Sequence, residues 1–460
     1  MSTSTTLTER PKVTFGKELR EKDFLFDVNW LNLNHGSYGT YPRSIQAQLR
    51  SFQSLAESRV DNFKRYTYPK LLDESRHAIA AFVKAPPETI VFVPNASMGV
   101  NTVLRNLVFE KGEKILYFSF VYGAVKNTVT YITETTPAEA IKIDVDIPFE
   151  NDWLVDALKS TIEKEKGKGN RVKVAVFDTV VSVPGIRLPF ERMVEVCREE
   201  RVLSCLDAAH AVGHVELDLG RLDPDFAVSN CHKWLFTPRA SALFYVPVRN
   251  QHLIRSTLPT SWGFIPLQTP PASSAANAAF LSNFADTGTL DSTPYLCVPA
   301  AIKYREQLGG EEKIRSYCQE LALEAANVTK EIFGEGTEVL DNETHTLTSC
   351  CMSNISLPLS HSSLIALAEE KQLTEALKIK GGLEWVVTEW IRKVCAVECN
   401  PAFSVMIYFY REKWWVRWSA QVYLELADFK YSAKELVKVC ERAAKGEAFW
   451  DAGKDGPSKL

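Results

Sequence analysis

Between about residues 90 and 250, short and almost uninterrupted apolar runs alternate with segments of helical periodicity. Such runs are typical of parallel strands that are buried on both faces. The alternation therefore predicts an α/β fold, with a mostly parallel central sheet flanked by helices. The apolar runs are TIVFVPN, KILYFSF, VKVAVFDTVVS, VLSCLDAA, FAVSNCHKW and ASALFYVPV, and the helical segments include GVNTVLRNLVF, YGAVKNTVTYI and FERMVEVCREE.

Polar residues stand where several of these predicted strands end. The segment 95–97 follows the first run and Tyr122 follows the second, whereas Asp207 ends the fourth run and Lys233 comes just after the fifth. In open α/β sheets, ligands bind beyond the carboxyl ends of the strands. We therefore expect these residues to gather at one edge of the sheet and to form a site there.

Lys233 and Asp207 match two of the four groups that bind pyridoxal 5'-phosphate (PLP). This cofactor needs a lysine for a Schiff base, an acid beside its pyridine nitrogen, an anion site for its phosphate and a group stacked on its ring. The segment NASMGVNTV predicts a helix start that offers free N–H groups to an anion, and Tyr122 is the candidate for stacking. Each residue alone also suits an ordinary structural role, so it is their order along the chain that favours PLP.

The pattern changes near residue 294, where loop-forming segments rich in Pro, Ser and Thr lead into a long helix. Further helical patterns and strand-like segments such as VMIYFYREKWWVRWSAQVYLE follow. We predict an N-terminal arm (1–30), a large PLP-binding domain (31–294), a smaller α+β C-terminal domain (295–450) and a disordered tail (451–460).

The net charge of −4 over 460 residues gives no reason to expect a nucleic-acid partner, and no stretch has the pattern of a membrane span or a signal peptide. The 10 cysteines show no spacing suited to zinc, so we expect free thiols and no metal. The chain ends in Ser458, Lys459 and Leu460, a tripeptide that the peroxisomal import receptor reads. We therefore expect a peroxisomal protein, with the cytoplasm as the alternative.

Four segments resemble a known family. LNLNHGSYGTYP, DAAHAVGH, SNCHKWLFTPR and VRWSAQVYLE are similar to segments of the class V aminotransferase superfamily, in its isopenicillin-N-epimerase-like branch. The similarity runs from about Asn32 to about residue 430. It implies PLP fold type I, PLP as the cofactor, a small-molecule amino-acid substrate and a homodimer with shared active sites.

The resemblance also implies roles for individual residues. Lys233 holds the cofactor and moves protons at the substrate α-carbon, Asp207 pairs with the ring nitrogen, and Tyr122 stacks on the ring. For His35 and His210 a purely structural role stays open. The implied cofactor-binding residues are Ala96, Ser97, Met98, Tyr122, Ser182, Asp207, Ala209, His210, Ser229, His232, Lys233 and, from the second subunit, Thr289; the implied substrate-binding residues are Asn34, His35, Trp262 and Arg417.

Within the branch, RNQHLIRSTLPTSWGF and the motifs above are similar over long stretches to the hercynylcysteine sulfoxide lyases of ergothioneine biosynthesis. This implies a carbon–sulfur lyase that turns a cysteine sulfoxide conjugate into a sulfenic acid, which is reduced to the thiol ergothioneine, with pyruvate and ammonia. Val125 departs from that pattern, because those lyases have a cysteine there. A loline-pathway type of enzyme, an epimerase or a desulfurase acting on another amino acid stays open, as does a non-catalytic scaffold.

The implied substrate carries a trimethylammonium group, and the faces of aromatic rings attract such cations. Core or interface packing is the alternative role for each aromatic residue in the matched segments. The candidates for a cation site are Tyr66, Tyr68, Trp262, Trp414 and Trp415.

Overall fold

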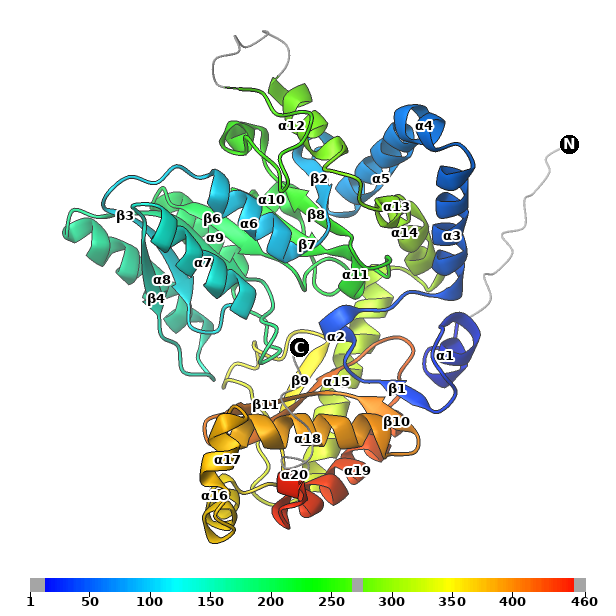
Figure 1. Cartoon of the computed structure of the whole chain (residues 1–460), viewed down its shortest axis with the longest axis vertical. Coiled ribbons are helices and arrows are strands. Elements are labelled where there is room, and N and C mark those ends of the chain that lie inside the picture. The colour runs from blue at the N-terminus through cyan, green and yellow to red at the C-terminus, as the bar shows by residue number, and fades with distance from the viewer. Residues whose placement is uncertain (1–12, 267–275, 451–460) are drawn as a thin grey trace, which may run out of the picture.

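The computed structural model describes residues 13–266 and 276–450, and most of the predicted strands form one seven-stranded sheet (Figure 1). Its strand order is β2-β8-β7-β6-β5-β3-β4, and β8 runs antiparallel to both of its neighbours while the other pairs are parallel. The predicted fold class is therefore confirmed. The strands are β2 (Ile90–Val93), β3 (Glu113–Phe118), β4 (Glu139–Ile143), β5 (Arg171–Asp178), β6 (Leu203–Asp207), β7 (Phe226–Asn230) and β8 (Ala242–Tyr245).

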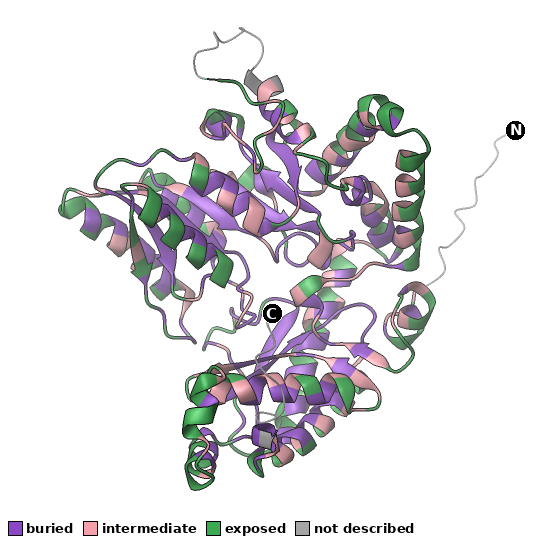
Figure 2. Ribbon diagram, viewed as in Figure 1, coloured by how far each residue is buried: buried purple, intermediate pink, exposed green. Residues whose placement is uncertain are grey.

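Helices cover both faces of this sheet, as the continuous apolar runs require (Figure 2). Along β5, Val174 and Val176 join one apolar cluster while Ala175 and Phe177 join another, because successive side chains point to opposite faces. Helices α6 (Ala96–Asn106), α7 (Gly123–Thr135) and α12 (Ala276–Ala285) contribute to one cluster, and α5 (Tyr68–Phe82), α8 (Asn151–Gly167) and α9 (Phe190–Glu199) to the other.

β4 lies at the edge of the sheet and differs from the strands predicted above. Three of its five residues are exposed, so its sequence EAIKI carries charges and forms no continuous apolar run. Charged side chains are common on edge strands, where they discourage pairing with other chains. The apolar-run criterion therefore identifies the six buried strands, among them the other edge strand, β2, and does not identify this one.

A second, smaller sheet has the order β11-β12-β9 and is antiparallel. Arg411 and Glu412 turn the β11–β12 hairpin with positive φ angles of 49° and 59°, as a two-residue hairpin loop requires. Helices α15, α18 and α19 pack around this sheet. The elements from residue 293 onward are α13 (Thr293–Leu296), α14 (Val298–Gln307), α15 (Glu311–Phe333), β9 (Met352–Ser356), α16 (His361–Glu370), α17 (Thr374–Ile379), α18 (Leu383–Val397), β10 (Ala402–Ser404), β11 (Met406–Tyr410), β12 (Lys413–Ser419), α19 (Leu426–Ala444) and α20 (Glu447–Trp450).

The described part of the N-terminal arm packs on the C-terminal domain. Arg20 of α1 (Lys17–Asp23) binds Asp428 of α19 at 2.7 Å, and β1 (Trp30–Asn32) pairs in parallel with β10. The arm, and the first residues that we predicted to belong to the large domain, therefore pack on the smaller domain. The other described elements are α2 (His35–Tyr38), α3 (Arg43–Ser58), α4 (Val60–Asn62), η1 (Phe63–Thr67), η2 (Pro87–Thr89), α10 (Leu219–Leu222), α11 (Cys231–Trp234) and η3 (Val248–Leu253).

α2 brings the N-terminal segment against α11, the short helix that carries Lys233. A side chain at Gly39 would place its Cβ 1.8 Å from the carbonyl oxygen of His232, and the φ angle of Gly39 is +64°. Only glycine permits both the approach and the backbone conformation. In the described part of the chain, no helix is long and apolar enough to cross a membrane, and no cluster of three or more His, Cys, Asp or Glu side chains suits a metal ion. Ser458, Lys459 and Leu460 lie outside the described residues.

Candidate active site

Lys233, Asp207 and Asp178 meet at the carboxyl end of the sheet. Asp178 ends β5 and Asp207 ends β6, where the two residues are paired in the parallel register, and Lys233 follows β7 on α11. Burial lowers the pKa of Lys233 to about 8, while the charges of Asp207 and Asp178 raise it and Arg417 lowers it further. With this pKa about a tenth of the amine is unprotonated at pH 7, far more than for an ordinary lysine, and the unprotonated form is the one that acts as a nucleophile or general base.

The two aspartates differ in their surroundings. Burial raises the pKa of Asp178 well above its ordinary value, and the negative charge of Asp207 raises it further. Burial also raises the pKa of Asp207, but the Ala209 N–H donates to its Oδ1 at 3.1 Å and, with Lys233, opposes that rise. Adjacent buried carboxyls oppose each other's ionisation, so the pair favours a single negative charge, and the hydrogen bond from Ala209 favours that charge on Asp207.

Asp178 is a site residue that we did not identify from the sequence. Its Oδ2 is buried and has no hydrogen-bond partner among the described residues. The signal was present, because Asp178 ends the apolar run VKVAVFD just as Asp207 ends VLSCLD. Since neighbouring parallel strands end at the same sheet edge, two such aspartates on adjacent strands are placed side by side.

His210 lies directly against the lysine. Its Nε2 is 2.8 Å from Nζ of Lys233, and its Nδ1 accepts a hydrogen bond from the indole N–H of Trp234 at 3.2 Å. The resemblance implies that His210 binds the cofactor, with a structural role left open. The observed contact is with the lysine that would hold the cofactor.

The amino end of α6 is the predicted anion site, but only some of its predicted N–H groups are free to bind an anion. Asn95 caps the helix by accepting from the Met98 N–H at 2.9 Å, and the Ala96 N–H donates to Asn230 Oδ1 at 2.8 Å. Of these three amides, that of Ser97 is the one with no partner among the described residues. The Ser97 N–H and hydroxyl, together with the positive end of the helix dipole, are therefore the groups available to a phosphate.

Ser229 and His232 are two further predicted cofactor-binding residues, and they differ in whether a hydrogen-bonding atom is left for a ligand. The Ser229 hydroxyl donates to the Ala208 carbonyl and accepts from the Val212 N–H, so it fixes the turn after Asp207. Burial lowers the pKa of His232 to about 4. Its Nδ1–H donates to the Ser241 carbonyl at 3.0 Å, which leaves Nε2 for a ligand.

Arg417 projects from β12 toward the large domain and is fully buried, with 0% exposure. Its guanidinium donates to Asn34 Oδ1 at 2.7 Å, to the Ser37 hydroxyl at 3.2 Å and to the Ser182 carbonyl. Among the described residues no carboxylate forms an ion pair with it, and its Nε has no partner. Burial lowers the pKa of Arg417 to about 10, so the group is still a cation at neutral pH.

His35 lies behind the lysine, where it is buried and neutral because burial lowers its pKa to about 3. Its ring packs edge-on against Trp234 at 5.0 Å, and its Nδ1 is 3.0 Å from the Tyr423 hydroxyl. This is the structural role that the sequence left open. Tyr122 is half exposed at the start of α7, and Thr289 lies exposed on the segment after α12.

The aromatic candidates for a cation site do not lie together. Trp414 and Trp415 are buried in the core of the smaller domain, and Tyr68 is buried in a cluster with Phe63 and Leu296. Trp262, by contrast, is 98% exposed. Trp414 and Trp415 therefore serve packing, as the alternative reading held.

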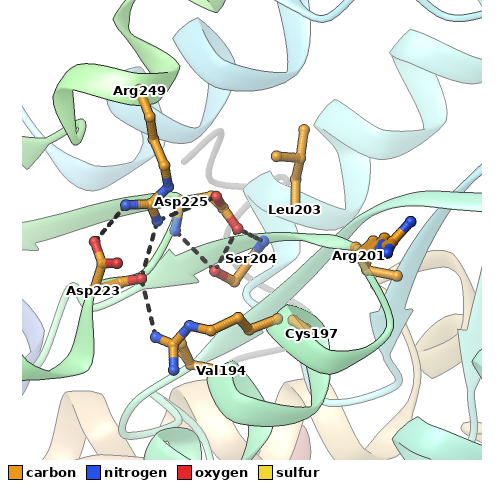
Figure 3. Close-up of a pocket in the computed structure, with 10 residues that line it drawn as sticks. Val194, Cys197, Arg201, Leu203, Ser204, Asp223, Asp225 and Arg249 are labelled. Atoms are coloured by element: carbon orange, nitrogen blue, oxygen red, sulfur yellow. Dashed lines mark hydrogen bonds and ion pairs between the residues drawn. The ribbon is translucent and has the colours of Figure 1, made fainter.

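A different cavity, of about 300 Å³, opens at the opposite end of β6 (Figure 3). It is lined by Leu203 and Ser204, which begin the strand that Asp207 ends. There Arg249 pairs with Asp223 at 2.6 Å and with Asp225 at 3.4 Å, so the charged side chains that line the cavity compensate one another. This cavity holds none of the groups described above and is separated from them by the length of the strand.

The site fits PLP on its own chemistry. It offers an amine with a lowered pKa, a buried carboxylate at the end of the adjacent strand, a helix amino end with a free amide and an uncompensated buried guanidinium. Lys233 would carry the cofactor, Asp207 would meet its ring nitrogen, and Ser97 and His232 would hold its phosphate. When bound, PLP supplies an electron-withdrawing ring that stabilises negative charge at the substrate α-carbon.

Comparison with known proteins decides the family. The family model for class V aminotransferases matches residues 42–372. The chain belongs to this family. The predicted membership is thus confirmed, PLP is the cofactor, and the protein is an enzyme of the PLP-dependent class V family.

Three similar proteins place the chain within the family. The L-cysteine desulfhydrase-like protein lolT1 of Epichloe uncinata is 34% identical over 94% of this chain and 97% of that protein. The hercynylcysteine sulfoxide lyase of Schizosaccharomyces pombe is 28% identical over 93% of this chain and 98% of that protein. The cystine C–S lyase C-DES, solved with cysteine persulfide, shares the fold with a TM-score of 0.68 and 15% identity, over 88% of this chain and 97% of C-DES.

Proposed function

We propose that the protein is a PLP-dependent carbon–sulfur lyase whose substrate is hercynylcysteine sulfoxide. The observation that carries the amino-acid part of this proposal is Arg417, a fully buried cation that no carboxylate of the described residues neutralises. A buried charge without a counter-ion is costly, so the site is completed by a ligand anion. The α-carboxylate of an amino acid supplies that anion in the geometry that a guanidinium binds best, with two parallel hydrogen bonds.

The other residues then act on the atoms next to that carboxylate. Asn34 and Ser182 hold the Arg417 guanidinium in place from two sides. Lys233, with its pKa near 8, removes the proton from the substrate α-carbon, and Asp207 would hold the ring nitrogen of PLP by a hydrogen bond. Loss of the α-proton expels the sulfur group from the β-carbon.

The overall reaction balances without an oxidant. A cysteine sulfoxide, R–S(O)–CH2–CH(NH3⁺)–COO⁻, breaks its Cβ–S bond as the α-proton passes to the leaving oxygen, which gives R–SOH and the unsaturated amino acid 2-aminoacrylate. Water then converts the amino acid to pyruvate and ammonium. A thiol reductant supplies the two electrons that turn R–SOH into the thiol R–SH and water.

Val125 bears on the choice of substrate. The sulfoxide lyases have a cysteine at this position, and in this chain Val125 is buried in the core between α7 and the sheet. The replacement of that cysteine is therefore a packing change and removes no group from the substrate side. This supports the sulfoxide as substrate, alongside the similarity to the lyase of Schizosaccharomyces pombe.

L-Cysteine is the second candidate substrate. The identity to the cysteine desulfhydrase-like protein of Epichloe uncinata is 34%, against 28% for the sulfoxide lyase. Cleavage of L-cysteine by the same residues would give hydrogen sulfide, pyruvate and ammonium. The two candidates share every residue described above and differ in the leaving group.

We expect the purified enzyme to release pyruvate from hercynylcysteine sulfoxide at a kcat/KM at least about tenfold above that for L-cysteine, because a larger leaving group contributes additional binding energy. Pyruvate is measured with a coupled dehydrogenase, and isopenicillin N serves as a substrate without a cysteine sulfoxide. A Val125→Cys variant should retain the preference. Pyruvate and sulfide from L-cysteine alone would establish the second candidate, and no pyruvate from any of them would refute the lyase.

We also propose that the enzyme is a homodimer, joined at the surface formed by α3, α4, η1 and the segment 289–293. A cavity of about 460 Å³ lies there, lined by Thr289 and by Val60 and Leu290, which are both more than half exposed. Exposed apolar side chains beside a cavity are typical of a surface that a partner covers. This supports the inference that Thr289 reaches the site of a second subunit.

Sedimentation of the purified protein is expected to give twice the chain mass of 51.7 kDa. A Leu290→Glu variant places a charge in the proposed interface and should shift the protein toward the monomer, because burial of an unpaired carboxylate is unfavourable. Val108→Glu, which charges another exposed apolar residue outside this surface, is the matched control. A monomeric wild type, or a dimer that both variants leave intact, would contradict the proposed interface.

A further inference from the structure

Both ring nitrogens of His210 form hydrogen bonds, and the partner of Nδ1 can act only as a donor. The indole nitrogen of Trp234 can donate but cannot accept, so at 3.2 Å it donates to Nδ1 of His210. Nδ1 therefore carries a lone pair. Burial lowers the pKa of His210 well below its ordinary value, so the ring is neutral and its one proton lies on Nε2, which faces Nζ of Lys233 at 2.8 Å.

A second histidine holds Trp234 in place, and its tautomer is fixed in the same way. The backbone N–H of Cys351 donates to Nε2 of His214 at 2.8 Å, so the proton of His214 lies on Nδ1 and points to the His210 carbonyl at 2.8 Å. The His214 ring stacks on the Trp234 indole, with centroids 3.9 Å apart and planes 19° apart. The direction of the indole N–H is thus set by a ring that is itself fixed at both nitrogens.

The chain of donors ends at the lysine. Because Nε2 of His210 bears a proton, Nζ of Lys233 must accept that hydrogen bond, and only the neutral amine has the lone pair to do so. An ammonium group at the same place would direct one N–H toward another.

The charges around Lys233 do not produce this state by themselves. Asp207 on β6 and Asp178 on β5 favour the ammonium form, whereas Arg417 on β12 disfavours it. His35 on α2 and His232 on α11 are neutral, because burial lowers the pKa of each to about 3 and about 4. Burial is the largest influence on Lys233, and the hydrogen bond from His210 acts in the same direction.

We propose that Trp234 is a positioning residue: by donating to His210 it fixes the Nε2–H tautomer, and this tautomer favours the unprotonated amine of Lys233, the form that reacts with the aldehyde of PLP. The residue that follows the lysine in sequence thus sets the state of the lysine through a ring 24 positions upstream. The role concerns residues of this chain alone and does not depend on which amino acid is the substrate.

Trp234→Phe tests this role, because it keeps an aromatic ring for His214 to stack on and removes the N–H. The freed His210 can then move its proton to Nδ1 and accept from an ammonium group. We expect the pH midpoint for capture of PLP by the cofactor-free protein, followed by visible absorbance, to rise by about one unit, with capture at pH 7 slowed about tenfold. Trp418→Phe removes an equally buried indole N–H, which donates to Thr329 in the smaller domain, and should leave the midpoint unchanged.

The tautomer itself is measured by ¹⁵N NMR of the histidine rings, which needs neither PLP nor activity. Among the eight histidines, the signal lost in a His210→Gln variant identifies His210. We expect it to show a protonated Nε2 in the wild type and a proton shared or shifted to Nδ1 in Trp234→Phe. A protonated Nδ1 in the wild type, or a capture midpoint that Trp234→Phe leaves in place, overturns the proposal.

Discussion

A Lys233→Ala variant is expected to lose lyase activity by a factor on the order of 10⁴ or more while its fold is retained. Lys233 is the residue that would hold PLP and move the α-proton, and proton transfer by a positioned group alone is worth about 10²- to 10⁴-fold. The change is compatible with the fold, because Lys233 lies in the four-residue helix α11 and alanine has the highest helix propensity.

Pyruvate release measures the activity, and dialysis followed by absorbance shows how the cofactor is held. The variant should still bind PLP through Ser97 and Asp207 but lose it on dialysis, whereas the wild type keeps it. Lys438→Ala, which removes an exposed lysine paired with Glu435, is the control for the loss of a positive charge. Activity within tenfold of the wild type would show that another residue carries the cofactor.

The residues that the sequence identified best are those whose position follows from the strand pattern. Asp207 and Lys233 come directly after apolar runs, so their place at the carboxyl edge of the sheet follows from parallel pairing alone. Asp178 obeys the same rule, although none of the family-like motifs contains it. The polar residue at the end of a predicted parallel strand is therefore a candidate site residue even where it belongs to no known motif.

Residues that depend on packing between distant segments were harder to place. His35 belongs to a motif that suggests the substrate, yet it packs against Trp234 because α2 crosses α11 at Gly39. The hydroxyl of Ser229 is used by the turn at Ala208 and Val212. Neither of these contacts can be predicted from the local sequence. A motif indicates the region in which a side chain lies but not the direction in which it points.

The N-terminal arm illustrates the same limit at the level of domains. Arg20 binds Asp428, and β1 pairs with β10 across more than 370 positions of the chain. A change of composition marks where a segment begins, but the surface on which it folds back is decided by long-range pairing. Our boundary at residue 31 therefore divides a segment that lies on one domain.

The Arg417 side chain offers the sharpest test of the substrate class. Arg417→Lys keeps the charge but loses the planar fork that grips a carboxylate with two hydrogen bonds, and Arg417→Met removes the charge. Breaking a buried ion pair typically costs about 3–5 kcal/mol, which corresponds to a fall in kcat/KM of about 10²- to 10³-fold or more. We expect Arg417→Met to reach this range and Arg417→Lys to fall in its lower part.

Loss of activity alone does not show which group of the substrate Arg417 binds, so the substrate is changed as well. The substrate that releases pyruvate is compared with its α-carboxamide, and ammonia release serves as a readout that both share. The wild type should prefer the acid by about the factor that Arg417→Met costs, and Arg417→Met should treat the two alike, because the partner of the carboxylate is gone. Arg392→Met, which removes a partly exposed arginine of the same domain that already pairs with Glu389, should keep the full preference. If Arg417→Met still prefers the acid as strongly as the wild type, the carboxylate binds elsewhere and the buried cation of β12 serves the fold.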